Sequence, residues 1–189
     1  MSKSLVEVKF DKAKLKRIEK TLKGVPGAMP KVMTRGINRT ATMSRTEIIR
    51  RISANVSLKK KTIRDGLQLE KAHRNKWAAK ITVISKRIPL MDFKARQGKR
   101  GVSYLISKNK GRQKIQDAFF AKLKSGHEGV FKRLGKSRLP ICELFGPSLG
   151  QVFSDAGKIS SEVQAKAGPL LEKNINDQVK MLLAKRGAA

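Results

Sequence analysis

An apolar period of three to four residues runs through residues 28–55 and constrains the fold more than any other feature of this chain. Its members are Met33, Ile37, Ala41, Ser44, Ile48 and Ile52. Because an α-helix brings residues at these intervals onto one face, the pattern predicts a single long amphipathic helix from Ala28 to Asn55. Pro30 is compatible with its first turn, where a backbone N–H has no helical partner.

The opposite side of this expected helix is basic. It carries Lys31, Arg35, Arg39 and Arg50. Two interpretations stay open: a solvated basic face over a core helix, or a contact for a polyanion.

The segments before and after this helix have short patterns of their own. "LVEVKF" (Leu5 to Phe10) predicts a strand whose apolar side chains are Leu5, Val6, Val8 and Phe10. Asp11 is expected to cap a helix that ends near Lys23, with the stripe Leu15, Ile18 and Leu22. Ser57 is expected to begin a short helix that ends at Gly66.

The middle of the chain predicts strands and the end predicts helices. The expected strands are 67–72, 77–85, 102–106, 118–123, 129–134 and a short apolar one within "RLPICELFGPS". Helices are expected from Ser148 and from Pro169 to Arg186, the latter with the stripe Leu170, Leu171, Ile175, Val179, Leu182 and Leu183.

This order predicts an α+β fold: long N-terminal helices, a central and mostly antiparallel sheet with basic hairpin loops, and C-terminal helices. We expect one domain over residues 1–189, mainly helical in 1–66, strand-rich and basic in 67–144, and helical in 145–189.

The charge of the chain is unusual. Its 189 residues hold 44 Lys and Arg against 14 Asp and Glu, a formal net charge of +30 with a pI near 10.9. A field of this sign attracts polyanions. Nucleic acid is the first partner that it suggests, an acidic protein surface the second and anionic lipid a distant third.

Membrane insertion and secretion are not expected. No apolar run approaches the roughly 18 to 20 residues of a spanning helix. Met1 to Phe10 alternates apolar and polar residues, unlike a signal peptide. The single cysteine, Cys142, excludes an internal disulfide and is expected to be a buried small hydrophobe. We expect synthesis in the cytosol.

"GVFKRLGKS" invites comparison with a nucleotide-binding P-loop. Five residues separate Gly129 from Gly135, one more than the P-loop has, and Pro140 falls where its helix would begin. We therefore predict that Gly135, Lys136 and Ser137 form a turn between two strands.

Signs of catalysis are weak elsewhere too. His73 and His127 are the only histidines, and neither has a second ligand at metal-binding spacing. Glu128 has no second acid placed for acid–base work. We expect no enzyme activity, no metal and no cofactor.

The strongest local signal is a basic block. Residues 94–138 contain fourteen Lys and Arg against two acids, Asp117 and Glu128. Two expected loops concentrate it, and we predict phosphate contacts for Lys94, Arg96, Lys99, Arg100, Lys108, Lys110, Arg112 and Lys114. If the loops are neighbouring hairpin tips, they can follow a phosphate backbone without reading its sequence.

Several ordered segments resemble one protein family. They are "GVPGAMPKVMTRGINRTATMSRTEIIRRIS" (Gly24 to Ser53), "VSLKKKTIRDGL", "IPLMDFKARQGKRGVSYLI" (Ile88 to Ile106) and "DAFFAKLKSGHEGVFKRLGKSRLPICELFGPS" (Asp117 to Ser148), followed by a helical end. The chain resembles the minor tail protein Z family, the tail-completion proteins of lambda-like long-tailed bacteriophages. None of these segments is a catalytic signature.

The resemblance implies a structural virion protein, located at the head–tail junction and made in the host cytoplasm. It would complete the head-proximal end of the tail for head joining and help to seat the DNA end for ejection. Its partners would be the tail terminator, the tube and connector proteins, with non-specific double-stranded DNA in the lumen of a homo-oligomeric ring, expected to be a hexamer. The alternative is a ribosomal or other RNA-associated basic structural protein, which the composition also fits.

Overall fold

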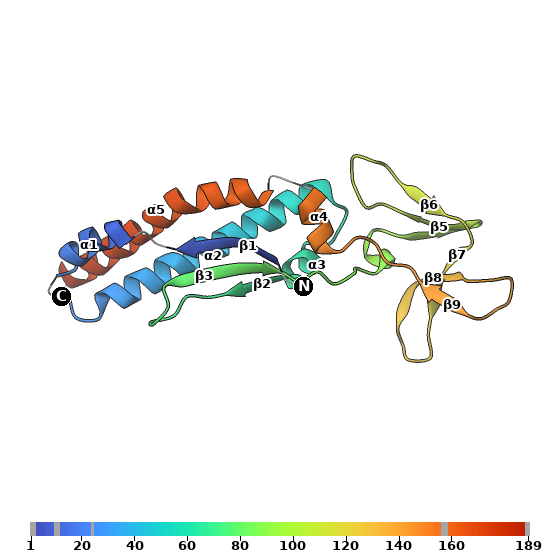
Figure 1. Cartoon of the computed structure of the whole chain (residues 1–189), viewed down its shortest axis with the longest axis horizontal. Helices are drawn as coiled ribbons and strands as arrows, with labels where there is room; N and C mark the ends of the chain where they lie inside the picture. Colours follow the sequence, from blue (N-terminus) through green and yellow to red (C-terminus); the bar gives the residue numbers. More distant parts are fainter. Residues whose placement is uncertain (1–2, 10–11, 24, 156–158, 188–189) are drawn as a thin grey trace. The chain divides into compact units, whose positions relative to one another are not determined.

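The computed structural model describes residues 3–9, 12–23, 25–155 and 159–187 (Figure 1). Its chain forms two compact units. The helical unit is formed within residues 2–48, 67–83 and 157–189, and the strand-rich unit within residues 49–66 and 84–156. A single domain over the whole chain stays a prediction.

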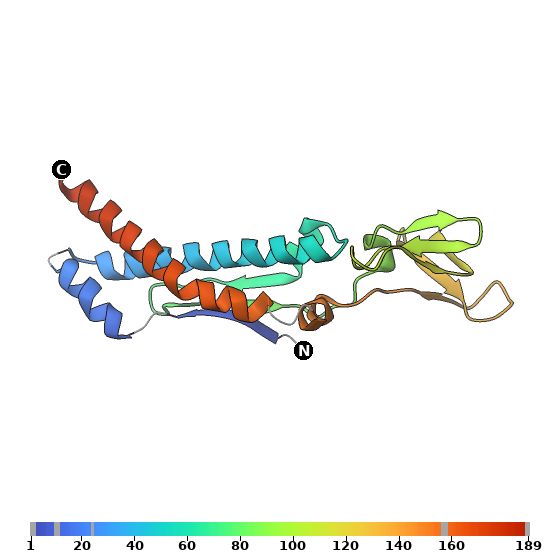
Figure 2. The same ribbon diagram turned by 90° about the horizontal axis from the view of Figure 1, so that it is seen from above.

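The helical unit combines helices with one small sheet. Its elements are β1 (Lys3–Lys9), α1 (Lys12–Thr21), most of α2 (Ala28–Asn55), β2 (Leu67–Glu70), β3 (Ala78–Val83) and α5 (Ile159–Gly187). The strands pair antiparallel in the order β1-β3-β2. In Figure 2, α2 runs along this sheet and α5 crosses α2 at an angle.

The sheet buries one face through the register of its strands. Val6 lies opposite Ile81 and Val8 opposite Ala79, while Leu69 pairs with Ile81 from the other side. Opposite residues share a face, and this alignment therefore brings the apolar side chains together beneath the helices. Phe10 and Asp11, with the cap predicted at Asp11, lie outside the described residues, and so does the side chain of Leu5.

The prediction for α2 is confirmed at both of its ends. The helix spans Ala28–Asn55, and all six residues of the predicted stripe are buried. Periodicity predicts this helix correctly because its apolar stripe is buried along the whole helix. The stripe residues from Met33 to Ile48 are buried in the helical unit, and Ile52 is buried in the strand-rich unit.

The prediction for the last helix is wrong at its start. We expected Pro169 to begin the helix, whereas α5 begins at Ile159 and contains Pro169 in its interior. Pro169 is exposed. Its effect on the backbone is outweighed because Val163 and Ala167 are buried and carry the apolar stripe of the helix across the proline.

The strand-rich unit contains two further antiparallel sheets and short helices. These elements are α3 (Lys60–Asp65), the single-turn helix η1 (Leu90–Asp92), β4 (Arg96–Gly98), β5 (Gly101–Tyr104), β6 (Gln113–Ile115), β7 (Ala118–Lys122), β8 (Glu128–Arg133), β9 (Ile141–Glu143) and α4 (Leu149–Asp155). The sheet orders are β4-β5-β6 and β7-β8-β9. The α+β class is therefore confirmed, with the strands divided among three small antiparallel sheets.

Phe93 lies at the centre of the strand-rich unit. Its ring is fully buried and touches the backbone at Gly146, where a Cβ would overlap the ring. The main chain closes around it, because Leu105 N donates to Phe93 O at 2.9 Å and Gly146 N donates to Ile88 O at 2.8 Å. Residues far apart in sequence thus form one core.

Two predicted helix caps have opposite outcomes. Ser148 caps α4: its Oγ accepts from Gln151 N at 3.3 Å, and Gln151 Oε1 accepts from Ser148 N at 3.0 Å, a reciprocal capping box. The cap predicted at Ser57 is wrong, because α3 begins after Lys59 and has no side-chain cap. Ser57 is buried, and its N–H donates to Ile106 O at 2.9 Å. Gly66 does end α3, as predicted.

Candidate nucleic-acid interface

The sheet β4-β5-β6 carries cationic side chains on its solvent face. Arg96 lies opposite Ser103, and Ser103 lies opposite Lys114, so all three point to the same side. Val102, next to Ser103, points to the other side and is fully buried. Arg96 and Lys114 are exposed. Both belong to short strands and not to the loops in which we expected them, which is a correction to the predicted loop boundaries.

Arg112 is tied to the same face by its own hydrogen bonds. Its Nη2 donates to the carbonyl oxygen of Lys94 at 2.7 Å, and to the carbonyl and hydroxyl oxygens of Ser103 at 3.2 and 3.3 Å. Lys94 has φ +49°, a backbone conformation that costs energy for a residue with a Cβ. The guanidinium therefore holds the strained turn at Lys94 against β5, which is a structural role.

Lys108 is also engaged by the protein. Its Nζ donates to the carbonyl oxygen of Ser53, and its backbone N–H donates to Asn55 O at 3.0 Å. The adjacent Ser107 forms a bridge with Val56. Lys108 therefore fastens the β5–β6 connection to the end of α2.

Lys99 and Arg100 form the two-residue turn between β4 and β5. Gly98 pairs with Gly101 at its base. Gly101 has φ +119° and lies against the backbone of Ile115, so a side chain there would collide with that strand. The glycine allows the turn to close and presents both exposed cations at its tip.

The two predicted basic loops are not neighbouring hairpin tips. The β4–β5 turn precedes β5 and the β5–β6 connection follows it. Consecutive turns of an antiparallel sheet lie at opposite ends of the shared strand. Lys99 and Arg100 therefore lie at one end of β5, and Lys110 lies in the connection that leaves the other end.

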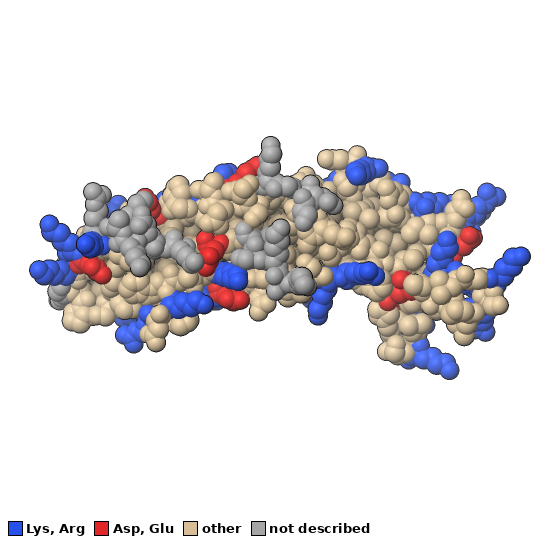
Figure 3. Space-filling model, viewed as in Figure 1, with Lys and Arg blue, Asp and Glu red and all other residues tan. Residues whose placement is uncertain are grey.

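The eight residues predicted to contact phosphates differ in their engagement within the protein. Of the eight predicted residues, six are exposed with charged groups that form no hydrogen bond or ion pair with any other described residue: Lys94, Arg96, Lys99, Arg100, Lys110 and Lys114. Arg96 and Lys114 share a face, whereas the others lie at turns around it. On the face shown in Figure 3, Lys and Arg are spread over the molecule and outnumber Asp and Glu.

The β8–β9 hairpin adds a second exposed feature, which the predicted set leaves out. Its loop, residues 134–140, contains Leu134 and Leu139, whose exposures of 70% and 66% are high for leucines. Arg133 stacks over the ring of Phe119 at 5.1 Å. Gly135, Lys136 and Ser137 lie in this loop between two strands, as predicted, and β9, which follows Pro140, forms an edge of its sheet.

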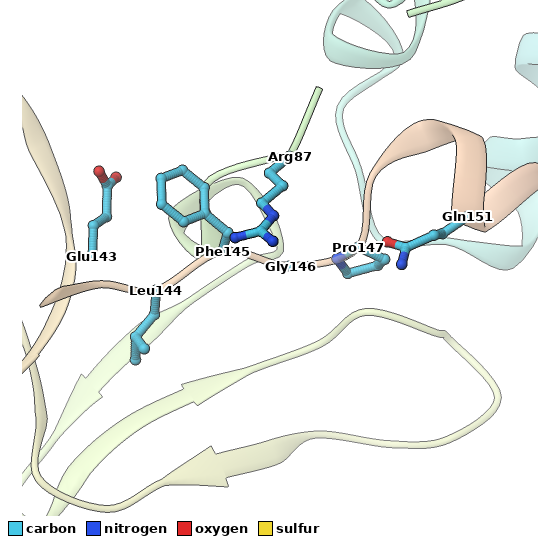
Figure 4. A pocket seen from close by; sticks show the side chains of 7 residues that line it. All are labelled: Arg87, Glu143, Leu144, Phe145, Gly146, Pro147 and Gln151. Atoms are coloured by element: carbon cyan, nitrogen blue, oxygen red, sulfur yellow. The ribbon is translucent and has the colours of Figure 1, made fainter. Parts of the chain in front are cut away.

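An open depression of about 530 Å³ lies beside the β7-β8-β9 sheet (Figure 4). Its lining is Arg87, Glu143, Leu144, Phe145, Gly146, Pro147 and Gln151. The Glu143 carboxylate contacts His127 Nε2 at 2.9 Å, and its polar group is thus already occupied.

The prediction that Cys142 is buried is wrong. Its side chain is exposed, because β9 alternates and Ile141 and Glu143 take the covered side. Within the described ranges, no three His, Cys, Asp or Glu side chains gather as metal ligands would. None of the helices in those ranges is long and apolar enough to cross a membrane.

The fold and surface define a strongly basic α+β protein in which the main feature is a set of exposed cations. A family model described as prophage minor tail protein Z matches residues 13–185. The chain therefore belongs to the prophage minor tail protein Z family. Curated proteins and solved structures gave no match.

Family membership confirms the coarser part of the functional prediction. The chain is a structural protein of a phage tail, located in the virion tail, where it interacts with other tail proteins.

Proposed function

We propose that this protein completes the head-proximal end of the phage tail, makes the tail competent to join the head and helps to seat the DNA end for ejection. Family membership supports the tail location. The observation that carries the rest is the set of six exposed cations without protein partners among the described residues of the strand-rich unit, within a chain of net charge +30.

The charge supports an oligomeric ring only if a neutralising partner is present. A hexamer would carry six times +30, and its copies would repel one another strongly. Duplex DNA in the lumen supplies the opposite charge, and acidic surfaces of the tail terminator, tube or connector proteins supply more. Since a lumen lined entirely with cations would hold DNA back, only part of the charge faces the DNA.

The two exposed features of the strand-rich unit suit different partners. Phosphates bind cations and gain nothing from leucine side chains, so Arg96 and Lys114 suit DNA. Leu134 and Leu139 stand among Arg133, Lys136 and Arg138, and this combination suits an acidic protein surface with an apolar centre. We therefore propose that the β4-β5-β6 face binds DNA and that the β8–β9 loop binds other tail proteins.

Locating the protein in particles tests this function. A phage lacking the chain would be complemented with a tagged copy, and the particles separated by sedimentation and labelled with gold. Label at the head–tail junction, together with unjoined heads and tails when the chain is absent, is the expected result. Label along the tail shaft or on ribosomal particles would overturn the proposal.

A further inference from the structure

A second group of cations, outside the eight predicted residues, lies along α2. Lys31, Arg35 and Arg39 are exposed and make no hydrogen bond or ion pair with any described residue. Further along the helix, by contrast, Arg50 and Arg51 have partners. The part of the basic face in the helical unit is therefore the part left free for a ligand.

The β2–β3 loop lies beside the same part of α2 in both views (Figures 1 and 2). Two hydrogen bonds fix it there: Asn38 Nδ2 donates to Ala72 O at 2.9 Å, and Ala72 N donates to Asn38 Oδ1 at 2.7 Å. At the helix start, the Arg74 guanidinium lies next to Gly27, where a Cβ would be 3.9 Å from Nη2. The loop therefore lies against α2 at Asn38 and reaches the start of the helix at Gly27.

The loop is ordered by bonds that leave its charges exposed. His73 and Lys76 exchange backbone hydrogen bonds of 3.1 and 3.0 Å, and Trp77 Nε1 donates to Arg74 O at 3.0 Å. The side chains of Lys71, Arg74 and Lys76 are exposed and have no described partner. The loop therefore presents three more cations beside α2.

Helical geometry places the loop next to the start of the row. At about 100° per residue, Asn38 lies about 20° from Lys31, about 60° from Arg35 and about 100° from Arg39 around the helix axis. The loop that Asn38 holds therefore borders the row at Lys31 and Arg35, and Arg39 lies farther round the helix. We call the six residues Lys31, Arg35, Arg39, Lys71, Arg74 and Lys76 the helix patch.

The dimensions of the helix patch suit a duplex phosphate backbone. Residues 31, 35 and 39 are spaced by about 6 Å along the axis, and the row therefore spans about 12 Å. Duplex DNA presents about seven phosphates over that length. Arginine can also bind a phosphate through two parallel hydrogen bonds.

An acidic protein fits less well. Protein interfaces centre on apolar side chains, and the six members of the helix patch are all cations. The nearest exposed large apolar side chain on α2 is Met43, one turn beyond Arg39.

We propose that the helix patch binds the phosphate backbone of duplex DNA as a separate site from the cations of the β4-β5-β6 sheet. The inference rests on the proposed function only in taking DNA as the ligand. Contact is independent of base sequence, because every group involved recognises phosphate. The patch would hold DNA through α2 together with the β2–β3 loop that Asn38 ties to it.

Salt-dependent binding of the purified full chain to a fluorescent 30-base-pair duplex tests the site. One variant carries Lys31→Gln, Arg35→Gln and Arg39→Gln, and another carries Lys71→Gln, Arg74→Gln and Lys76→Gln. The matched control removes three charges from exposed α5 lysines of the same unit, through Lys173→Gln, Lys180→Gln and Lys185→Gln. Circular dichroism melts check that each variant folds, as expected for exposed positions.

The slope of log K against log salt is negative, and loss of three phosphate contacts should reduce its steepness by about 2.7 for either patch variant, with little change in the control. If the slope changed as much in the control as in the patch variants, the effect would be due to net charge alone, and the proposed site would be refuted. Unchanged slopes in both patch variants would also overturn it. Gold labelling of virions is a separate readout, and a misplaced label would reject the proposed function while leaving this site standing.

Discussion

Gly36 of α2 lies directly against Ile175 of α5. A Cβ built on Gly36 would stand 2.5 Å from Cγ1 and 3.3 Å from Cα of Ile175, which is fully buried. Because Ile175 is branched at Cβ and enclosed, it cannot turn away. The absence of a side chain at Gly36 is therefore what allows the two helices to cross so closely.

Gly36→Ala should destabilise the protein despite the better helix propensity of alanine. Propensity would contribute up to about 1 kcal/mol in favour, whereas overpacking a closed contact costs about 1–3 kcal/mol. We expect a net loss of about 1–2 kcal/mol in the free energy of unfolding, measured with urea.

Asn176→Ala is the matched control on α5. Asn176 is exposed, and alanine has the better helix propensity, so this substitution should stabilise by up to about 0.7 kcal/mol. If both substitutions changed stability with the same sign, the close crossing of α2 and α5 would be refuted.

A buried hydrogen bond supports the same crossing. Asn174 Nδ2 donates to Thr40 Oγ1 at 2.9 Å, and Thr40 Oγ1 donates to Gly36 O at 2.9 Å. Thr40→Val would leave the buried Asn174 amide without this acceptor, at a cost of about 1–3 kcal/mol. In a double-mutant cycle with Asn174→Ala, we expect a coupling energy of about 1 kcal/mol, and strict additivity would contradict the bond.

The sequence predicts the helices of this fold better than their contacts. The α2 stripe is readable because its period is local and unbroken. The start of α5 is not readable from the sequence, since a proline such as Pro169 is common in the first turn of a helix. Only the tertiary burial of Val163 and Ala167 shows that the helix continues through it. Neither Gly36 nor Asn174 has a local signal, because the reason for each lies on the other helix.

The candidate site was predictable in composition and not in geometry. The density of cations in residues 94–114 is visible in the sequence. That Arg112 and Lys108 are occupied by carbonyl oxygens depends on Lys94, Ser103 and Ser53, brought close only by folding. Charge counts therefore overestimate the number of cations free for a ligand.

Arg112→Gln and Lys99→Gln should separate these two kinds of cation. Loss of the Arg112 bonds to Lys94 and Ser103 should lower stability by about 1 kcal/mol, less than the roughly 1.5–3 kcal/mol of a charged hydrogen bond because the site is exposed. Lys99→Gln should change stability by less than about 0.5 kcal/mol. Thermal melts of the two variants give the comparison, and equal melting temperatures would count against the structural task of Arg112.

Cys142 should react readily in the folded protein. Its side chain is exposed on β9, opposite Lys132 in the register with β8. We expect a thiol-reactive chromophore to modify one cysteine per chain without denaturant, at a rate similar to that of the unfolded chain. Strong protection in the native state would restore the expectation of a buried thiol.

Leu134→Ser with Leu139→Ser should leave stability unchanged and impair assembly. Both leucines lie in the β8–β9 loop with most of their surface in water, so folding gains little from them and the change in unfolding free energy should stay within about 0.5 kcal/mol. Val130→Ser, at a fully buried position of β8, is the contrasting variant and should destabilise the protein. If the loop contacts an acidic tail protein, the double variant will fold and bind DNA normally yet be lost from purified virions. Normal incorporation of the double variant would show that the exposed leucines contribute nothing to that contact.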